Sequence, residues 1–487
     1  MITRRMLIQS LLISPLLPIE KAISKTLTNK NTIANSYDVL EEMVPSEPGQ
    51  IVTLKSYHMG EKKGGGIFIA VQDKTKKSDK GTVIQAVNGL SWIRIDSLKK
   101  IKKPEWFGCY GDNENDDTSA FNLMLHALNT GDNIILAPNS IYFNRLKTES
   151  DEWVITQNNI TIIGNNATLS RRATNPNDVD NISTIKIMGA NNFKIKGKLL
   201  ITTNEPNFPL TDTNNNIISD ETFPRAYVSS HGLYLKQVNY VSLSKELTCS
   251  NAVFPCYIFN CKNLDIKGSY TKSGQVHPFK SQDLQLGSGI KIAKTENFKV
   301  RIRTSDTAYC GCEIEPYTTQ GNIDLISEKS FMHGCIIHRN SNNMQVNVTC
   351  NNAKRAAIQI SAGSSEIRGD IYSNNCKYGC IITSEKNNIC KNIELNIHCT
   401  NTKDMNLVVR NSDGNYSSIK NATIQLFFNN INIQNEVRKT TNSPRTPLIK
   451  ISNAEKCKIL IPSNTDSNAI SISNSTDCDV IRKKRYP

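Results

Sequence analysis

The sequence predicts an all-β protein whose main part is a parallel β-helix, with a small β module before it and one helix that caps its first end. Three observations support this prediction. Asn, Ser, Thr and Ile are abundant, which suits strands joined by polar turns. Similar strand-like segments recur every 22 or 23 residues in the second half of the chain. Only one stretch has the spacing of an amphipathic helix.

The first 35 residues have the pattern of an export signal followed by a linker. A pair of arginines, Arg4 and Arg5, precedes a mildly apolar stretch from Met6 to Ile19, and this arrangement resembles a twin-arginine signal. No apolar run reaches the length of about 18 residues that a membrane span needs. We therefore expect a protein that is exported to the periplasm or secreted, without a membrane span.

Residues 36–103 predict a small β module. Short β-type runs surround a triple glycine turn at Gly64 to Gly66, and two more runs flank a hairpin turn at Asn88 and Gly89. The next segment predicts the helix. Its N-cap chemistry is supplied by Asp116, Asp117 and Thr118, one apolar face is formed by Phe121, Leu125 and Leu128, and it ends near Gly131. A single helix before hundreds of strand residues suggests a plug for the open end of a β stack.

Residues 104–480 predict the β-helix, and residues 481–487 form a basic tail. Gly311, Gly334, Ala356 and Gly379 begin similar segments at steps of 23, 22 and 23 residues. A second strand phase lies between them, and two strand phases in each repeat are typical of a solenoid whose coils stack. One coil cannot bury its own apolar side chains, whereas a stack has a continuous interior.

Alternation along each strand predicts which side chains point inward. One inward column should contain isoleucines, and a second, two residues earlier, should contain cysteines as reduced thiols. The glycine before each cysteine should permit the turn. The isoleucine column is Ile258, Ile290, Ile314, Ile337, Ile358 and Ile382, and the cysteine column is Cys256, Cys312, Cys335 and Cys380.

The outward positions of the same coils predict a catalytic wall. Glu313 and Glu315 should point outward from one strand, and a vertical row should contain Lys291, Glu315, His338 and Gln359. Asp283 and Asp306, six residues before Gly289 and Cys312, should be near neighbours of this patch. The predicted catalytic residues are Asp283, Asp306, Glu313, Glu315 and His338, and the predicted substrate-binding residues are Lys291, Tyr309, Arg339, Arg355 and Gln359.

Such a cluster suits the cleavage of polysaccharides. Glycoside hydrolysis uses one protonated and one ionised carboxyl group, and crowding of two carboxylates pushes their pKa values apart. A gap of about 5 Å between them favours retention of configuration, and about 6.5–9.5 Å favours inversion.

Charge and composition restrict the partners. The formal charge of +14 favours acidic polysaccharide, anionic lipid or nucleic acid, of which nucleic acid is the weakest because no nucleic-acid-binding motif is present. No cysteine spacing indicates a metal site, and no cofactor is expected, although Asp212, Asp220 and Glu221 in one acidic loop could hold Ca²⁺.

Two stretches resemble a known family. The Gly-Gly-Gly-x-Phe stretch at residues 64–68 and "FGCYGDNENDDTSAF" at residues 107–121 resemble the pectate-lyase-like β-helix proteins of phage tailspikes, over roughly residues 36–480. This resemblance implies a right-handed β-helix, often trimeric, that depolymerises bacterial surface polysaccharide with acidic side chains on its outer wall. The apparent export signal is instead similar to that of β-helix proteins encoded with bacterial exopolysaccharide genes, so a virion tail is the alternative location.

Three functions follow as hypotheses. The first is a polysaccharide hydrolase that uses paired carboxylates. The second is a lyase that performs β-elimination on a uronic-acid polymer, with His338, Tyr309 or Lys291 as base and Arg339 to neutralise the carboxylate. The third is a non-catalytic β-helix protein that binds or helps to assemble exopolysaccharide.

Overall fold

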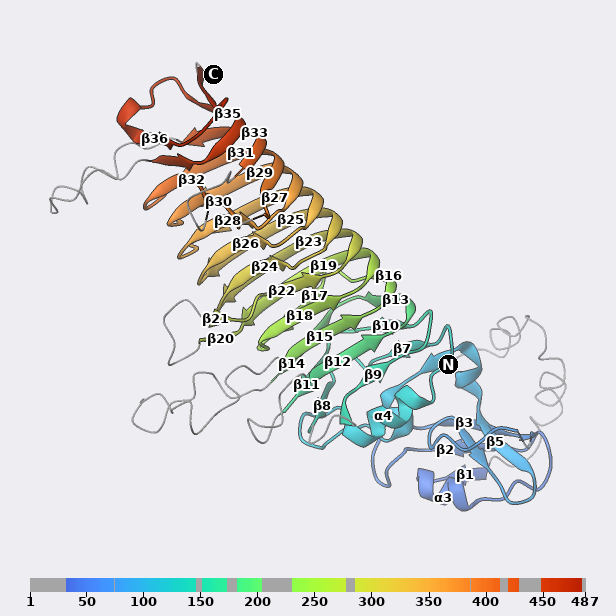
Figure 1. Cartoon of the computed structure of the whole chain (residues 1–487). Helices are drawn as coiled ribbons and strands as arrows, with labels where there is room; N and C mark the ends of the chain where they lie inside the picture. Colours follow the sequence, from blue (N-terminus) through green and yellow to red (C-terminus); the bar gives the residue numbers. More distant parts are fainter. Residues whose placement is uncertain are drawn as a thin grey trace, which may run out of the picture.

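Two long parallel sheets dominate the structure. The computed structural model describes residues 32–73, 75–145, 151–172, 182–203, 230–276, 285–385, 387–411, 419–428 and 448–483. In these residues the chain winds into a solenoid whose coils stack along one axis, with a small module at its N-terminal end (Figure 1). The right-handed parallel β-helix expected from the sequence is confirmed.

The N-terminal module is a five-stranded sheet in the order β1-β2-β3-β5-β4. β1 pairs in parallel with β2, and the other pairs are antiparallel, including β4 and β5 around the expected turn at Asn88 and Gly89. β1 lies inside the range assigned to the linker. The elements of this module are β1 (Thr32–Ala34), α3 (Tyr37–Glu42), β2 (Ile51–Leu54), β3 (Gly66–Gln72), β4 (Val83–Gln85), β5 (Leu90–Arg94) and the 3₁₀ turn η1 (Ile95–Lys99).

The triple glycine of this module forms a cradle for one buried arginine. Arg94 is fully buried and donates hydrogen bonds to the backbone oxygens of Gly64 (3.0 Å), Gly65 (2.9 Å) and Gly81 (3.1 Å). A Cβ atom on Gly66 would lie 2.3 Å from Nη1 of Arg94, so the guanidinium needs a residue without a side chain there. The glycines therefore give room and acceptors to a buried cation, in addition to a turn.

The helix α4 (Thr118–His126) covers the first end of the solenoid, as expected (Figure 1). Phe121 stacks on Trp153 with ring centroids 4.0 Å apart, and Phe121, Leu125 and Leu128 belong to the main hydrophobic core. The capping differs in detail from the prediction. Oδ1 of Asp116 accepts the backbone N–H of Thr118 (3.0 Å), whereas Asp117 turns away from the helix and accepts from the N–H groups of Tyr110 and Gly111.

Every coil of the solenoid contributes to a twelve-stranded or an eighteen-stranded sheet, counted over the described residues. The twelve-stranded sheet contains β9 (Val154–Ile155), β12 (Ser183–Met188), β15 (His231–Lys236), β18 (Phe254–Phe259), β22 (Ile290–Ala293), β24 (Cys310–Ile314), β26 (His333–Ile337), β28 (Ala356–Ser361), β30 (Tyr378–Ser384), β32 (Met405–Asn411), β34 (Ile449–Ser452) and β36 (Ile470–Ser473).

The eighteen-stranded sheet contains β6 (Ile101–Lys102), β7 (Asn133–Ile135), β8 (Ile141–Asn144), β10 (Thr161–Ile163), β11 (Ala167–Arg171), β13 (Asn191–Lys196), β14 (Leu199–Thr203), β16 (Asn239–Ser242), β17 (Leu247–Ser250), β19 (Lys262–Ser273), β23 (Glu296–Thr307), β25 (Thr319–Ser330), β27 (Asn342–Asn351), β29 (Ser365–Asn374), β31 (Cys390–Thr400), β33 (Ile419–Phe428), β35 (Ala454–Pro462) and β37 (Asp479–Lys483). β37 reaches into the range assigned to the basic tail, and β6 lies in the range assigned to the module. Short elements outside these sheets are η2 (Pro104–Phe107), η6 (Ser467–Ala469) and the hairpin of β20 (Gln275–Val276) and β21 (Gln285–Leu286).

The twelve-stranded sheet has the two predicted inward columns, but two of the predicted isoleucines lie in the other column. Cys256, Cys312, Cys335 and Cys380 do share a column, and all 14 cysteines are free thiols. However, Ile290 pairs with Cys312 and Ile358 pairs with Cys335. Those two isoleucines therefore belong to the cysteine column, and the places assigned to them are filled by Ile292 and Ile360.

A column of small residues lies directly before the cysteine column and accounts for the observed register. Its members are Gly289, Gly311, Gly334, Ala357 and Gly379. A Cβ atom on Gly311 would lie 2.4 Å from Oγ of Ser327, and one on Gly334 would lie 2.5 Å from Sγ of Cys350. Neither glycine has a positive φ, so the expected role in a turn is wrong. These positions are small because the eighteen-stranded sheet approaches them closely, and this approach fixes the register.

Arg94→Lys should destabilise the N-terminal module. A lysine ammonium cannot reproduce the fork of donors, so buried carbonyls lose partners and the free energy of unfolding should fall by about 2–4 kcal/mol. Chemical denaturation measures this. Arg303→Lys, at an exposed position of β23, is the matched control and should change little. Equal effects of the two changes would contradict the cradle.

Gly334→Ala should destabilise the solenoid by about 1–3 kcal/mol through overpacking against Cys350. Removing the sulfur should relieve part of the strain. We therefore expect Gly334→Ala to cost less in a Cys350→Ala background than in the native chain, which a double-mutant cycle of unfolding free energies measures. Additive effects would mean that the two positions do not touch.

Candidate active site

The candidate site lies on the outer face of the twelve-stranded sheet, at β22, β24, β26 and β28. The strand register places Lys291 beside Glu313, Glu313 beside Ile336 and Ile336 beside Gln359. The predicted row of Lys291, Glu315, His338 and Gln359 is therefore wrong. Lys291 and Gln359 lie in the row of Glu313, two residues before the row of Glu315 and His338.

Glu315 and His338 do lie in adjacent coils, as expected. The backbone N–H of Glu315 donates to the carbonyl of Ile292 (2.7 Å), and that of His338 donates to the carbonyl of Ile314 (2.8 Å). The two side chains therefore follow the ends of neighbouring strands. The negative charge of Glu315 raises the pKa of His338, although burial of the imidazole has the larger effect and lowers it overall.

One lysine joins the two glutamates. Nζ of Lys291 lies 2.9 Å from Oε1 of Glu315 and 3.6 Å from Oε1 of Glu313. Oε2 of Glu313 also accepts a hydrogen bond from the Ser288 hydroxyl at 2.7 Å. Glu313 was expected to be exposed, but its side chain is only 8% exposed, whereas the side chain of Glu315 is 25% exposed.

The environment separates the pKa values of the two carboxyl groups. Burial raises the pKa of Glu313 to about 7, helped by the negative charge of Glu315 and opposed by Lys291. Burial would also raise the pKa of Glu315, but the charge of Lys291 and hydrogen bonds from Glu313 and Lys291 together lower it. At pH values below about 7 and above the pKa of Glu315, Glu313 is therefore the protonated member of the pair.

Nζ of Lys291 lies within 3.6 Å of a carboxylate oxygen of each glutamate, so one cation holds both carboxyl groups at one place on the sheet. We call this pair, Glu313 and Glu315 joined through Lys291, the dyad.

The other predicted residues surround this dyad at different depths. Nδ1 of His338 lies 3.2 Å from the Ser361 hydroxyl, which leaves the second ring nitrogen without a partner among the described residues. Tyr309 is half-buried, and burial raises the pKa of its hydroxyl. Arg339 is exposed, and its charge contributes to the lowered pKa of His338; Arg355 is half-buried and acts similarly on the deeply buried His333.

Asp306 does not join the site. It occupies a left-handed position at the end of β23, in the other sheet, where Nζ of Lys329 lies 3.9 Å from its carboxylate. Lys272 and Lys329 hold the same left-handed position in the two neighbouring coils, so this place is a corner of the coil. Asp306 was predicted to lie near the site because it precedes Cys312 by six residues. The chain turns from one sheet to the other between these two residues, so the prediction placed Asp306 on the wrong sheet. Asp283 lies outside the described residues.

Sequence reasoning missed an aromatic row beside the dyad. Tyr234 and Tyr257 occupy the same outward row as Lys291, and their rings stack at 5.1 Å with an angle of 4°. Nζ of Lys291 lies 5.2 Å from the ring centroid of Phe254 and 5.9 Å from that of Tyr257. The signal was present in "LYL" and "CYI", which repeat the frame of "CEI" three and two coils earlier.

Some expectations fall outside the described residues, namely the export signal with Arg4 and Arg5 and the calcium candidates Asp212, Asp220 and Glu221. Within the described ranges, no group of three or more His, Cys, Asp or Glu side chains is placed to hold a metal ion. Among the same residues, no helix has the length and apolar character needed to cross a bilayer.

Comparison with known proteins finds similarity to phage proteins over short parts of the chain. Residues 33–97 match the family described as the phage tail protein small four-stranded beta-sheet domain. A capsule K2-specific depolymerase of Klebsiella phage vB_KpnP_KpV74 is 35% identical over 78 residues, which are 16% of this chain and 13% of that protein. The chain thus spans a small part of the length of this curated relative.

Solved structures agree in fold. The family 28 exopolygalacturonase of Yersinia enterocolitica aligns with a TM-score of 0.51 at 12% identity, over 88% of this chain and 85% of that one. Tailspike protein 2 of Escherichia coli O157:H7 bacteriophage CAB120 aligns with a TM-score of 0.44 at 14% identity, over 97% of this chain and 57% of that one. The exopolygalacturonase alignment, together with the matches to the phage tail domain and the capsule depolymerase, confirms the resemblance to tailspike and pectate-lyase-like β-helix proteins. At 12% identity the exopolygalacturonase establishes the fold alone.

Proposed function

We propose that this chain cleaves a bacterial capsular, O-antigen or exopolysaccharide by hydrolysis at the Glu313–Glu315 dyad. The observation that carries the proposal is a buried Glu313 beside a more exposed Glu315, with Lys291 in contact with both carboxyl groups. Burial and Lys291 separate the pKa values of the two groups. Glu313 would protonate the departing glycosidic oxygen, and ionised Glu315 would take a proton from the attacking water. The similarity to a capsule depolymerase supports a polysaccharide as substrate.

The aromatic row gives the substrate a place to lie. Tyr234, Phe254 and Tyr257 lie along the sheet on the N-terminal side of Lys291, and tyrosine rings offer apolar contact area with a polar tip. A glycan that follows the solenoid axis would contact these rings and then reach Lys291 and the dyad. Lys291 is held by two carboxylates, so its charge serves to orient them.

A lyase is the second candidate, and one observation favours it. Burial keeps the pKa of His338 below its ordinary value, so the imidazole is neutral near pH 7 and can accept a proton. The neighbouring carboxylates raise the pKa of Lys291, and burial raises that of Tyr309, which disfavours both of them as bases. His338 would abstract the proton, and exposed Arg339 would neutralise the uronate.

A β-helix that only binds polysaccharide, or helps to assemble it, is the third candidate. A homotrimer, and a location outside the cytoplasm or on a virion tail, belong to the same proposal. They rest on the resemblance to tailspikes and on the sequence of the first 35 residues.

Glu315→Gln should reduce cleavage by about 10²–10⁴-fold, because an amide cannot accept the proton of water. Purified chain is incubated with a panel of capsular and exopolysaccharides, and the products are sized. Glu328→Gln, at an exposed position of β25, is the control and should leave cleavage unchanged. If no polymer is shortened by the native chain, the binding function replaces the catalytic one.

His338→Ala separates the two chemistries. A hydrolase should lose less than about tenfold, whereas a lyase should lose about 10²–10⁴-fold. The native lyase would also produce the ultraviolet absorbance of an unsaturated sugar as digestion proceeds. That absorbance, together with full activity of Glu315→Gln, would contradict hydrolysis by the dyad.

The pH profile of cleavage should be bell-shaped. The rate should fall above about pH 7 as Glu313 loses its proton, and it should fall in acid below the ordinary glutamate pKa of 4.5 as Glu315 gains one. Lys291→Met removes the charge that lowers both pKa values, so both limbs should move to higher pH. Limbs that stay in place would mean that other groups control the rate. Initial rates of reducing-end release measure both profiles.

A further inference from the structure

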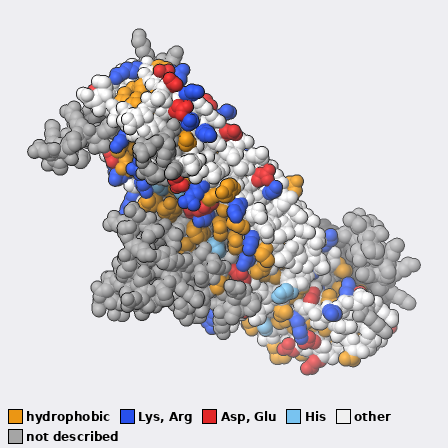
Figure 2. All heavy atoms as spheres, viewed as in Figure 1, with side chains coloured by type: hydrophobic (Ala, Val, Ile, Leu, Met, Phe, Trp, Pro, Cys, Tyr) orange, Lys and Arg blue, Asp and Glu red, His pale blue; other side chains and the backbone are white. Residues whose placement is uncertain are grey.

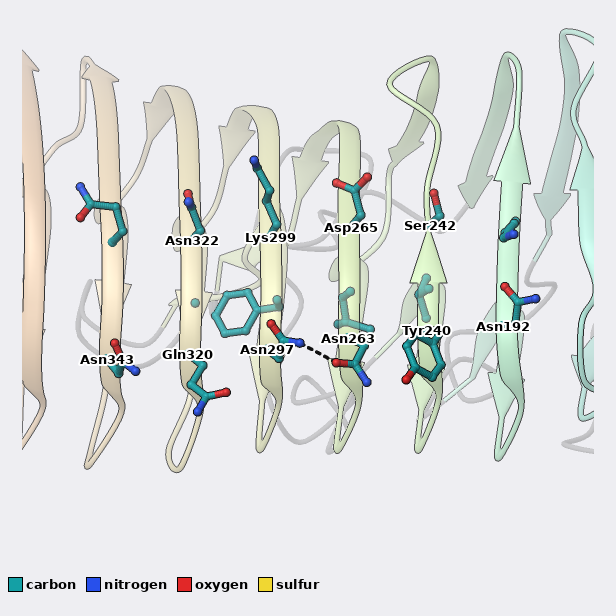
Figure 3. Close-up of a pocket in the computed structure, with 16 residues that line it drawn as sticks. Asn192, Tyr240, Ser242, Asn263, Asp265, Asn297, Lys299, Gln320, Asn322 and Asn343 are labelled. Atoms are coloured by element: carbon teal, nitrogen blue, oxygen red, sulfur yellow. Dashed lines mark hydrogen bonds between the residues drawn. The ribbon is translucent and has the colours of Figure 1, made fainter.

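The eighteen-stranded sheet carries a long groove, whereas the dyad lies on the twelve-stranded sheet. It has a volume of about 930 Å³ and runs across β13, β16, β19, β23, β25 and β27 (Figure 3). Because parallel strands lie about 4.8 Å apart, its polar groups repeat at that interval along the solenoid axis. The flank of the solenoid where these strands lie is mostly neutral and polar (Figure 2).

Two parallel rows of side chains form its walls. One row has left-handed backbone, with φ from 54° to 59°, and contains Asn192, Tyr240, Asn263, Asn297, Gln320 and Asn343. The second row lies two residues further along each strand and contains Lys194, Ser242, Asp265, Lys299, Asn322 and Gln345. Figure 3 shows both rows and the hydrogen bond from Nδ2 of Asn297 to Oδ1 of Asn263.

Tyr240 is the one aromatic side chain among the six residues of the first row. A left-handed backbone suits asparagine and is uncommon for a bulky side chain, yet this coil has a tyrosine that is 58% exposed. Asparagine at that position would continue the amide ladder at a lower conformational cost. An aromatic ring held there against its backbone preference indicates a binding role.

The charges of the groove are predominantly positive. The carboxylate of Asp265 is engaged by Lys267 (2.6 Å) and Arg301 (3.1 Å). Neither Lys194 nor Lys299 forms an ion pair with any residue that the structure describes. Oδ1 of Asn322 is buried and has no hydrogen-bond partner within the described part of the chain.

We propose that this groove binds an acidic oligosaccharide along the solenoid axis, as a non-catalytic site separate from the dyad. The amides would bind hydroxyl groups, Tyr240 would stack on a sugar ring, and Lys194 and Lys299 would pair with its carboxylates. The site does not depend on the dyad being catalytic.

Other occupants fit the groove less well. The apolar floor residues Val241, Leu264 and Phe298 are each less than 5% exposed, so a protein partner would find little apolar surface to bury. The two lysines of the groove are too few to hold a nucleic-acid backbone, whose binding depends on many neutralised phosphates.

The test uses the full chain in a Glu315→Gln background, which stops cleavage at the dyad, and an array of acidic and neutral bacterial oligosaccharides. We expect acidic glycans to bind, and calorimetry with the tightest of them should show at least fivefold weaker binding for Tyr240→Asn and for Lys299→Ala. Tyr240→Asn should keep or raise the unfolding midpoint, because the new residue suits the backbone. Lys391→Ala, at an exposed position of β31 outside the groove, is the control and should bind normally.

Three outcomes would overturn the proposal. The first is that no acidic glycan binds the Glu315→Gln chain. The second is that Tyr240→Asn and Lys299→Ala bind as tightly as Lys391→Ala, while Tyr257→Ala at the dyad wall abolishes binding. The third is that sedimentation shows Tyr240→Asn to dissociate an oligomer without affecting glycan affinity, which would make the groove an interface between copies. Cleavage of polymers by the groove variants is measured separately, so loss of groove binding is distinguishable from failure of the catalytic proposal.

Discussion

The close approach of the two sheets at one column of small residues determines the register on which the rest of the structure depends. Gly311 and Gly334 lie where a Cβ atom would meet side chains of the eighteen-stranded sheet. Since side chains alternate along a strand, a shift of one residue would turn the whole inner set outward. The packing of this column therefore determines that Cys312 and Ile314 are inside, that Glu313 is outside, and that Lys291 lies beside it in the next coil.

The sequence predicted the solenoid because its signals are local and repeated. A period of 22 or 23 residues identifies stacked coils, and the proximity of Glu315 and His338 follows from that period alone. The exact alignment of a coil is harder to predict where its motif is altered. Ile290 and Ile358 stand where other coils have cysteine, so matching by residue type moved Lys291 and Gln359 by two positions. Matching by the small residue in front gives the observed register, because size is what the neighbouring sheet restricts.

The burial of Glu313 could not be read from the alternation of residues. An outward side chain on a strand is ordinarily solvated, and its exposure depends on what covers the sheet. Here the carboxyl group is shielded and held by Ser288 and Lys291. Asp306 was predicted to lie in the site because it is close to the site in sequence, yet it lies at a corner of the coil. The burial of Glu313 and the position of Asp306 both depend on neighbouring parts of the fold, and the repeat pattern of the sequence contains no information about those neighbours.

The same repeat produces different environments on the two sheets of the solenoid. At the dyad, desolvation raises the pKa of Glu313 while the charge of Lys291 helps to lower that of Glu315, so the surroundings separate the pKa values of two identical residue types. On the eighteen-stranded sheet, the left-handed turn of each coil favours asparagine, and stacking converts that local preference into a continuous polar row. Most of this row follows from backbone geometry and needs no ligand to account for it. Tyr240 does not follow from backbone geometry, and an aromatic ring between two coils that carry asparagine is the kind of observation from which function can be inferred.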